Sequence, residues 1–208
     1  MLGGRYDEVD ADGDLTLDDA GEFSPQVALN YKLGDSSSVF VSYSEAFTPN
    51  AFVNLEVSPT EPFDPEESDQ LEVGIKAEFF NGKLQTSAAV YSIDKTNVLT
   101  AVNGLPVLLD GQSSDGLELS VSGQPIQGMN VVAGYSYIDA EVAGQGIEGN
   151  RPRNVAENTF NLWTSYEWQS GALEGLGVGG GLFYTSDRFG DDANTFSLGS
   201  YTLSLIHI

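Results

Sequence analysis

The residues most able to bind a metal ion lie near the start of the chain, in the run EVDADGDLTLDD. With Gly13 aligned to the turn glycine of a calcium-binding loop, oxygen donors fall at the positions that such loops use. The predicted ligands are the side chains of Glu8, Asp10, Asp12 and Asp19 and the backbone carbonyl of Asp14. The fit is incomplete, because the first position holds Glu, the last holds the shorter Asp, and no helix pair is expected beside the loop. A solvated acidic loop is therefore the alternative interpretation.

Composition excludes several other kinds of chemistry. The chain has no cysteine and one histidine, His207, so thiolate sites, disulfides and a histidine-based triad or zinc site are excluded within it. Neighbouring carboxylates such as Glu66 and Glu67 are weak candidates for acid–base work without a site that perturbs them. No nucleophile motif or phosphate loop is found, so neither an enzyme nor a cofactor is predicted. The net charge of −23 argues against a nucleic-acid partner.

The segment DQLEVGIKAEFF, residues 69–80, indicates which elements must position any such site. One alternate set is apolar (Leu71, Val73, Ile75, Ala77 and Phe79), and the other contains Glu72, Lys76 and Glu78. A strand turns successive side chains to opposite faces, so this pattern predicts a strand between two different environments. If the apolar side is lipid, a shift by one residue would turn a lysine into it at a cost of about 2–4 kcal/mol.

Similar alternation recurs along nearly the whole chain and predicts about ten strands and no helix. In the segment LQTSAAVYSID, we expect Ala89, Tyr91 and Ile93 on the apolar face, while Phe40 breaks the pattern of its own strand. An interfacial belt would use aromatic residues on this face. Those expected there are Tyr31, Tyr43, Tyr91, Tyr135, Tyr166, Trp168 and Tyr184.

The predicted connections alternate in length. Long ones are expected at 10–21, 48–68, 98–113, 143–158 and 189–198, and short ones at 34–37, 81–83, GQPIQG and QSGALEG. A soluble sandwich has no reason to send every long loop to one end, whereas a transmembrane barrel has short turns on one side and long loops on the other. The fold class predicted is therefore all-β, an antiparallel transmembrane β-barrel.

Several segments together resemble the C-terminal half of a TonB-dependent siderophore receptor. They are SVFVSYSEAFTPN, LEVGIKAEFFNGKLQTSAAVYSIDKTNV, NVVAGYSYIDAEV, NRPRNVAENTFNLWTSYEW and GLGVGGGLFYTSDRFGDDANTFSLGSYT, in the family's order. The resemblance covers most of residues 22–202. It implies an outer-membrane barrel of about 22 strands, closed by an N-terminal plug. Such a receptor imports ferric siderophore when the TonB complex acts on the plug.

The resemblance leads us to expect only part of such a receptor in this chain. Residues 1–202 are expected to form about ten barrel strands, with no plug domain and no TonB-contacting segment. The last six residues, LSLIHI, resemble one reading frame of a transposon-end sequencing adapter, so residues 203–208 are predicted to be non-native. An ordinary apolar strand is the alternative interpretation of these six residues.

The resemblance also suggests where a ligand would bind, since the family binds it with the plug and the outer loops. Loop aromatics could face the vestibule, and loop arginines are among the few cations able to attract an anionic iron complex. The candidates are Phe47, Asn50, Phe52, Phe63, Arg151, Arg153 and Arg188. For each residue the alternative is structural, as an anchor of a strand end or as the partner of a neighbouring acid.

The function implied is an outer-membrane receptor and transporter for ferric siderophore, working with TonB and surrounded by lipid. Two other classes of protein stay open on the sequence. A secreted calcium-binding all-β adhesin would also have acidic loops and no cysteine, and a passive porin would share every barrel argument.

Overall fold

The computed structural model describes residues 1–9, 20–49, 64–102, 105–144 and 146–207. The described chain is all-β, as predicted, and no helix in it is long and apolar enough to cross a membrane. The strands are β1 (Leu2–Val9), β2 (Ala20–Lys32), β3 (Ser37–Thr48), β4 (Glu66–Phe79), β5 (Leu84–Val102), β6 (Leu105–Gly123), β7 (Met129–Ala143), β8 (Asn158–Glu167), β9 (Gly177–Thr185), β10 (Arg188–Phe189), β11 (Ser197–Leu198) and β12 (Tyr201–His207).

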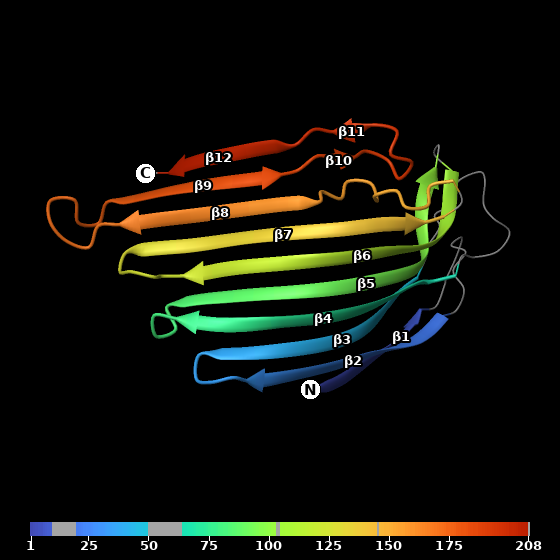
Figure 1. Ribbon diagram of the computed structural model, residues 1–208, viewed down its shortest axis with the longest axis horizontal. Coiled ribbons are helices and arrows are strands. Elements are labelled where there is room, and N and C mark those ends of the chain that lie inside the picture. Colours follow the sequence, from blue (N-terminus) through green and yellow to red (C-terminus); the bar gives the residue numbers. More distant parts are fainter. Residues whose placement is uncertain (10–19, 50–63, 103–104, 145, 208) are drawn as a thin grey trace.

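Ten of these strands form one antiparallel sheet, which we call the wall. Each strand pairs with the next in sequence, except that β12 pairs with β9 because β10 and β11 form a separate small ladder. Figure 1 shows short turns at one end of the wall and longer connections at the other. The prediction for 98–113 was wrong in part: β5 continues to Val102 and β6 begins at Leu105, so a long hairpin stands where a loop was expected.

Strand pairing separates the wall into two faces, because directly opposed residues of an antiparallel pair share a face. One row runs across the strands as Tyr31, Val39, Ile75, Ala88, Leu119, Tyr135, Phe160, Tyr184 and Thr202. We call its side the apolar face. The adjacent row, on the polar face, is Asn30, Phe40, Gly74, Ala89, Glu118, Ser136, Thr159, Thr185 and Tyr201.

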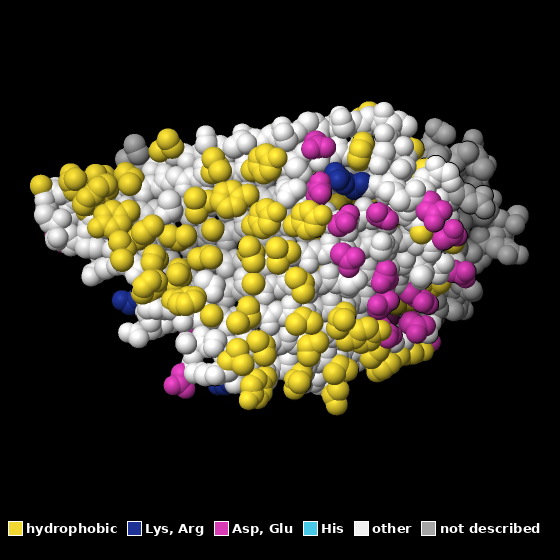
Figure 2. Space-filling view, in the orientation of Figure 1, with side chains coloured by type: hydrophobic (Ala, Val, Ile, Leu, Met, Phe, Trp, Pro, Cys, Tyr) yellow, Lys and Arg dark blue, Asp and Glu magenta, His cyan; other side chains and the backbone are white. Residues whose placement is uncertain are grey.

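The apolar face is exposed rather than packed against another layer of the protein. Leu71, Val73 and Ile75 of β4 are 48%, 47% and 41% exposed, and they follow the register expected for DQLEVGIKAEFF. Figure 2 shows hydrophobic side chains as a broad band over this face, with acidic side chains gathered beyond it toward the long connections. Exposed apolar area of this extent requires a partner other than water.

The face predicted for β5 was wrong. Val73 of β4 lies opposite Val90, and Val90 lies opposite Leu117, so the even-numbered residues of β5 are on the apolar face. Tyr91 is therefore on the polar face, where its ring covers Gly116. The sequence was ambiguous here because small and apolar residues fall in both alternate sets, and only the neighbouring strands decide between them.

Aromatic rings cover glycines at other places on the polar face. A Cβ atom added to Gly74 would lie 2.6 Å from the ring of Phe40, which explains the residue that broke the pattern in β3. Trp163 similarly covers Gly179 and Gly181. A ring that lies flat over a glycine occupies space that a side chain would otherwise fill, so these glycines have a packing role.

The strand β12 departs from the alternation of the rest of the wall. Leu203 and Leu205 lie opposite Phe183 and Gly181 on the polar face, while Ser204 lies opposite Leu182 on the apolar face. All seven residues of β12 nevertheless pair with β9. The origin of residues 203–208 stays a prediction.

Candidate ligand-facing site in the long connections

The site is built where the β5–β6 hairpin meets the connections on either side of β8 and β9. We call the residues 96–102, 105–111, 146–157 and 186–196 the loop cluster. The β5–β6 hairpin loses its pairing at Asn97, whose φ of 55° is left-handed, and regains it at Val98. At its far end the Thr100 hydroxyl donates a hydrogen bond to Asp192, which is 92 residues away in sequence.

The most buried apolar side chains of the described residues belong to this cluster or adjoin it. Val142, Ala140 and Leu109 are 2%, 3% and 4% exposed. Leu109 approaches Gly144 closely, since a Cβ atom there would lie 2.9 Å from its Cδ2. The hairpin and the end of β7 therefore form a small hydrophobic core at one end of the wall.

Asp192 is a buried acceptor at the centre of the loop cluster. Asp192 is 8% exposed. Its carboxylate accepts hydrogen bonds from the Thr100 hydroxyl and from the backbone N–H of Arg153, the latter at 2.7 Å. Its carbonyl oxygen also accepts from the Asn150 side chain at 3.0 Å. Buried carboxylates are costly unless hydrogen-bonded, so these donors compensate Asp192 and tie the three segments together.

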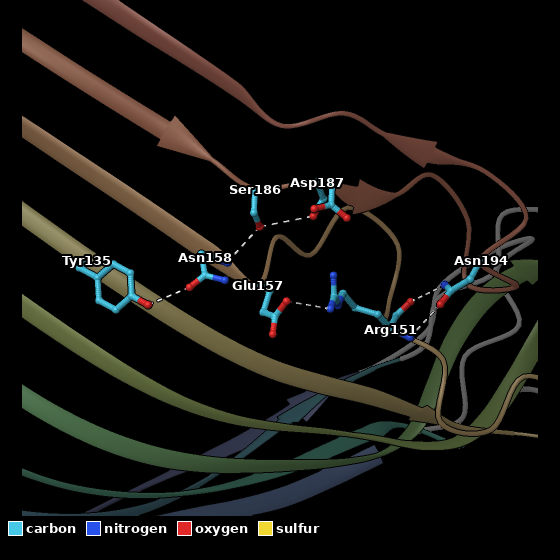
Figure 3. A network of polar contacts seen from close by, with 7 residues as sticks. All are labelled: Tyr135, Arg151, Glu157, Asn158, Ser186, Asp187 and Asn194. Carbon is cyan, nitrogen blue, oxygen red and sulfur yellow. Dashed lines mark hydrogen bonds and ion pairs between the residues drawn. The ribbon is translucent and has the colours of Figure 1, made fainter.

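Asn194 provides a second link between the same connections. Its Oδ1 accepts from the Arg151 N–H at 3.1 Å, and its Nδ2 donates to the Arg151 carbonyl at 2.8 Å. The amide thus pairs with the backbone as a strand would, as Figure 3 shows. A φ of 54° at Asn194 suits this residue type, which tolerates left-handed geometry.

A third link joins the middle of β7 to the start of β8 and the end of β9. The N–H of Asn158 donates to the Ser186 hydroxyl, and the N–H of Ser186 donates to the Asn158 carbonyl. The Tyr135 hydroxyl donates to Oδ1 of Asn158 at 2.8 Å (Figure 3). The strand ends beneath the loop cluster are therefore fixed by side chains as well as by the ladder.

Two of the three arginines predicted to contact a ligand lie over aromatic rings. Arg151 forms a 3.1 Å ion pair with Glu157 and lies over the ring of Phe189 at 5.9 Å. Arg188 instead lies over the ring of Tyr201, on the polar face, at 5.6 Å.

The structure describes only some of the other residues predicted to contact a ligand. Arg153 is exposed, and its side chain forms no ion pair within the described part of the chain. Phe47 is 7% exposed, so it is packed rather than free. Asn50, Phe52 and Phe63 lie outside the described residues. Contact of any of these with a ligand stays a prediction.

The calcium prediction also falls mostly outside the described residues. Only Glu8 is described, exposed at the end of β1 opposite Gly21, while Asp10, Asp12, Asp14 and Asp19 are not. Among the described residues, no group of three or more acidic or histidine side chains could hold a metal ion. The calcium loop stays a prediction, which calorimetry with millimolar calcium on the complete protein would check.

An acidic row runs along the apolar face, between the hydrophobic band and the loop cluster. Glu45 lies opposite Asp69, and Asp69 lies opposite Asp94. Farther along, Asp115 lies opposite Asp139. These residues follow the same alternate sets as the apolar ones, so the row marks where the hydrophobic band ends (Figure 2).

Sequence reasoning missed Asp192, Asn194 and Asn158. Each lies in a stretch rich in polar residues, where one acid or amide resembles the next. Their importance comes from partners that are 23 to 92 residues away, such as the Tyr135 partner of Asn158 and the Thr100 partner of Asp192. No local pattern indicates such pairs. The arrangement that results is a set of loops held together by hydrogen bonds.

Comparison with known proteins identifies the family of this chain. Residues 1–205 match the family model for "TonB dependent receptor-like, beta-barrel". The chain is 33% identical to the ferrichrome outer membrane transporter/phage receptor of Escherichia coli K12, over 97% of this chain and 28% of that protein. It is 34% identical to the ferrioxamine B receptor of Salmonella typhimurium SL1344, over 97% of this chain and 30% of that protein.

A solved structure agrees in fold. The crystal structure of the siderophore receptor PiuA from Acinetobacter baumannii matches with a TM-score of 0.76 and 27% identity, over 89% of this chain and 29% of that one. The chain thus spans roughly three tenths of the length of these relatives, at 28%, 30% and 29%. The exposed apolar face is the surface that such a barrel turns toward lipid. The chain belongs to the TonB-dependent receptor β-barrel family, and its ten-stranded wall is part of an outer-membrane barrel.

Proposed function

We propose that the complete protein is a receptor that imports a ferric siderophore across the outer membrane, energised by the TonB complex. In this proposal the chain contributes part of the barrel wall and part of the outer loops, and it performs no enzymatic step. The observation that carries the proposal is the division of the wall into a lipid-compatible face and a polar face. The names of the relatives, which are receptors for iron complexes, support the choice of ligand.

The polar face suits the inside of a receptor barrel. An open hollow of about 580 Å³ lies along it, and its lining includes Glu72, Lys76, Glu118, Ser136 and Asn161. Charged and hydroxyl side chains of this kind can be hydrated or can contact a second polar domain. A lipid-facing wall with a hydrated interior is what a plugged transporter barrel requires.

Transport by the complete gene product tests the proposal. A strain lacking its own siderophore receptors would carry the complete gene and be supplied with a panel of ⁵⁵Fe-loaded siderophores of the hydroxamate, catecholate and carboxylate classes. We expect accumulation of at least one complex, and its loss when a protonophore removes the energy supply. Accumulation that survives the protonophore would indicate a passive porin. No accumulation from any member of the panel, despite assembled receptor in the outer membrane, would contradict the proposal.

A further inference from the structure

The three arginines of the loop cluster differ in whether a carboxylate already neutralises the charge of the guanidinium. Arg151 is paired with the Glu157 carboxylate at 3.1 Å. Arg188 forms no ion pair with any acid of the described residues, although the chain carries 31 acids. Its Nε donates to Oδ1 of Asn154 at 2.7 Å, and an amide oxygen fixes a guanidinium without cancelling its charge.

The contact with Tyr201 places the Arg188 guanidinium on the polar side of the wall. It lies over the ring of Tyr201, which belongs to the same row as Thr185 and Thr159 of the polar face. The ring of its neighbour Phe189 lies instead against the Arg151 guanidinium, at 5.9 Å. Successive residues of a strand point to opposite sides, which is why Arg188 and Phe189 contact different neighbours.

The guanidinium is held in place but has an unused hydrogen-bonding group. Stacking on an aromatic ring and a hydrogen bond at Nε restrict its orientation before any ligand arrives. Its Nη1 atom is buried and has no hydrogen-bond acceptor within the described part of the chain. A buried donor without an acceptor is unfavourable by itself, and an anionic group brought beside it would remove that cost.

We propose that Arg188 is a specificity-determining residue, which recognises an ionised carboxylate on an anionic ferric siderophore entering the vestibule. The inference rests on the proposed function and extends it by naming the chemical class of the ligand. A guanidinium fits a carboxylate with two parallel N–H donors, which gives both charge and directional recognition. Neutral hydroxamate complexes offer no such partner, so the residue would favour carboxylate-bearing complexes over them.

The complete receptor, purified in detergent, permits a direct test by quenching of its intrinsic fluorescence. The probes are ferric citrate and a mixed citrate–hydroxamate siderophore as carboxylate-bearing complexes, with ferrichrome as the neutral complex. We expect a carboxylate-bearing complex to bind best. Arg188→Ala should weaken that binding by about tenfold or more, because the charged hydrogen-bonded pair is lost. Arg188→Lys should weaken it by less, because lysine keeps the charge but not the two parallel donors. Binding by Arg188→Ala should also depend less on salt concentration.

The control is Lys83→Ala, which removes one positive charge from the short β4–β5 turn at the other end of the wall. It should bind as the unchanged receptor does. Heat-modifiable migration on gels would confirm that each variant is assembled. If the alanine variant does not assemble, Arg188→Gln replaces it, because glutamine keeps a donor for the Asn154 side chain. Unchanged affinity in the Arg188 variants, or best binding of the neutral complex, would overturn this inference alone. If no ferric complex binds, the proposed function fails, and the inference fails with it.

Discussion

In the wall, stability comes from backbone ladders and from whatever surrounds the sheet, whereas in the loop cluster it comes from the protein's own side chains. Wall residues such as Val73 and Ile75 are 47% and 41% exposed. In the loop cluster and the adjoining end of β7, Val142 is 2% exposed and Asp192 is 8% exposed with several donors around its oxygen atoms. The wall therefore depends on its solvent, while the cluster can keep its shape in water.

This difference indicates which positions of the two regions tolerate substitution. A position in the wall is constrained by the face on which it lies, and any side chain compatible with that face is acceptable. A position in the loop cluster is constrained by individual partners, often far away in sequence. Variants chosen in pairs can test whether the two regions obey these separate rules.

The largest effect is expected for a charge on the lipid-facing side of the wall. In the complete receptor, Val73→Lys would place an ammonium group in the hydrophobic band, at about 2–4 kcal/mol near the midplane. We expect a strong loss of assembled receptor, measured by heat-modifiable migration on gels. The matched control Gln70→Lys adds the same charge to the polar face, since Gln70 lies opposite Ser44. Equal assembly of the two variants would contradict the assignment of the faces.

The next effect concerns the rings that cover glycines on the polar face. A Cβ atom at Gly116 would lie 2.3 Å from the ring of Tyr91, so Gly116→Val should destabilise the complete receptor by about 1–3 kcal/mol through overpacking. The double variant Gly116→Val with Tyr91→Ser should recover part of this loss, because the ring is gone. Thermal unfolding in detergent measures both. Failure of the second change to recover stability would show that the ring is not the cause.

A local effect is expected in the loop cluster. Asp192→Ala would leave the Thr100 hydroxyl and the Arg153 N–H without their acceptor, at about 1–3 kcal/mol. We expect faster hydrogen exchange and proteolysis in the connections at 146–157 and 186–196, with the unfolding temperature of the wall unchanged. Asp187→Ala, which removes an exposed carboxylate nearby, should have little effect. If the wall unfolds earlier as well, the two regions are not independent.

The smallest effect is expected for the ion pair between Arg151 and Glu157. Both side chains are partly exposed, at 25% and 38%, so solvent screens their attraction. Arg151→Ala should change stability by less than about 1 kcal/mol. A double-mutant cycle with Glu157→Ala, measured by thermal unfolding, gives the coupling between them. A larger coupling would mean that the pair contributes to holding the loop cluster together.

The fold was largely predictable because alternation is a property of each strand by itself. The register of DQLEVGIKAEFF, the all-β class and the number of wall strands follow from spacing along the chain. The face of β5 was not predictable, since Ala88 and Val90 in one set compete with Ala89 and Tyr91 in the other. The prediction of a long loop at 98–113 missed the β5–β6 hairpin, although Asn-Gly between the apolar runs VLTAV and LPVLL is a hairpin signal.

Alternation along the chain is enough to specify a two-faced β wall, because apolar residues at every second position leave one side that water does not suit. Which arginine lies beside the polar face, and which donors surround Asp192, became clear only from the folded arrangement. Those outcomes depend on contacts between residues up to 92 positions apart, as for Thr100 and Asp192. A side chain's face can be read from its neighbours in sequence, but its partner is fixed only when distant strands are brought together.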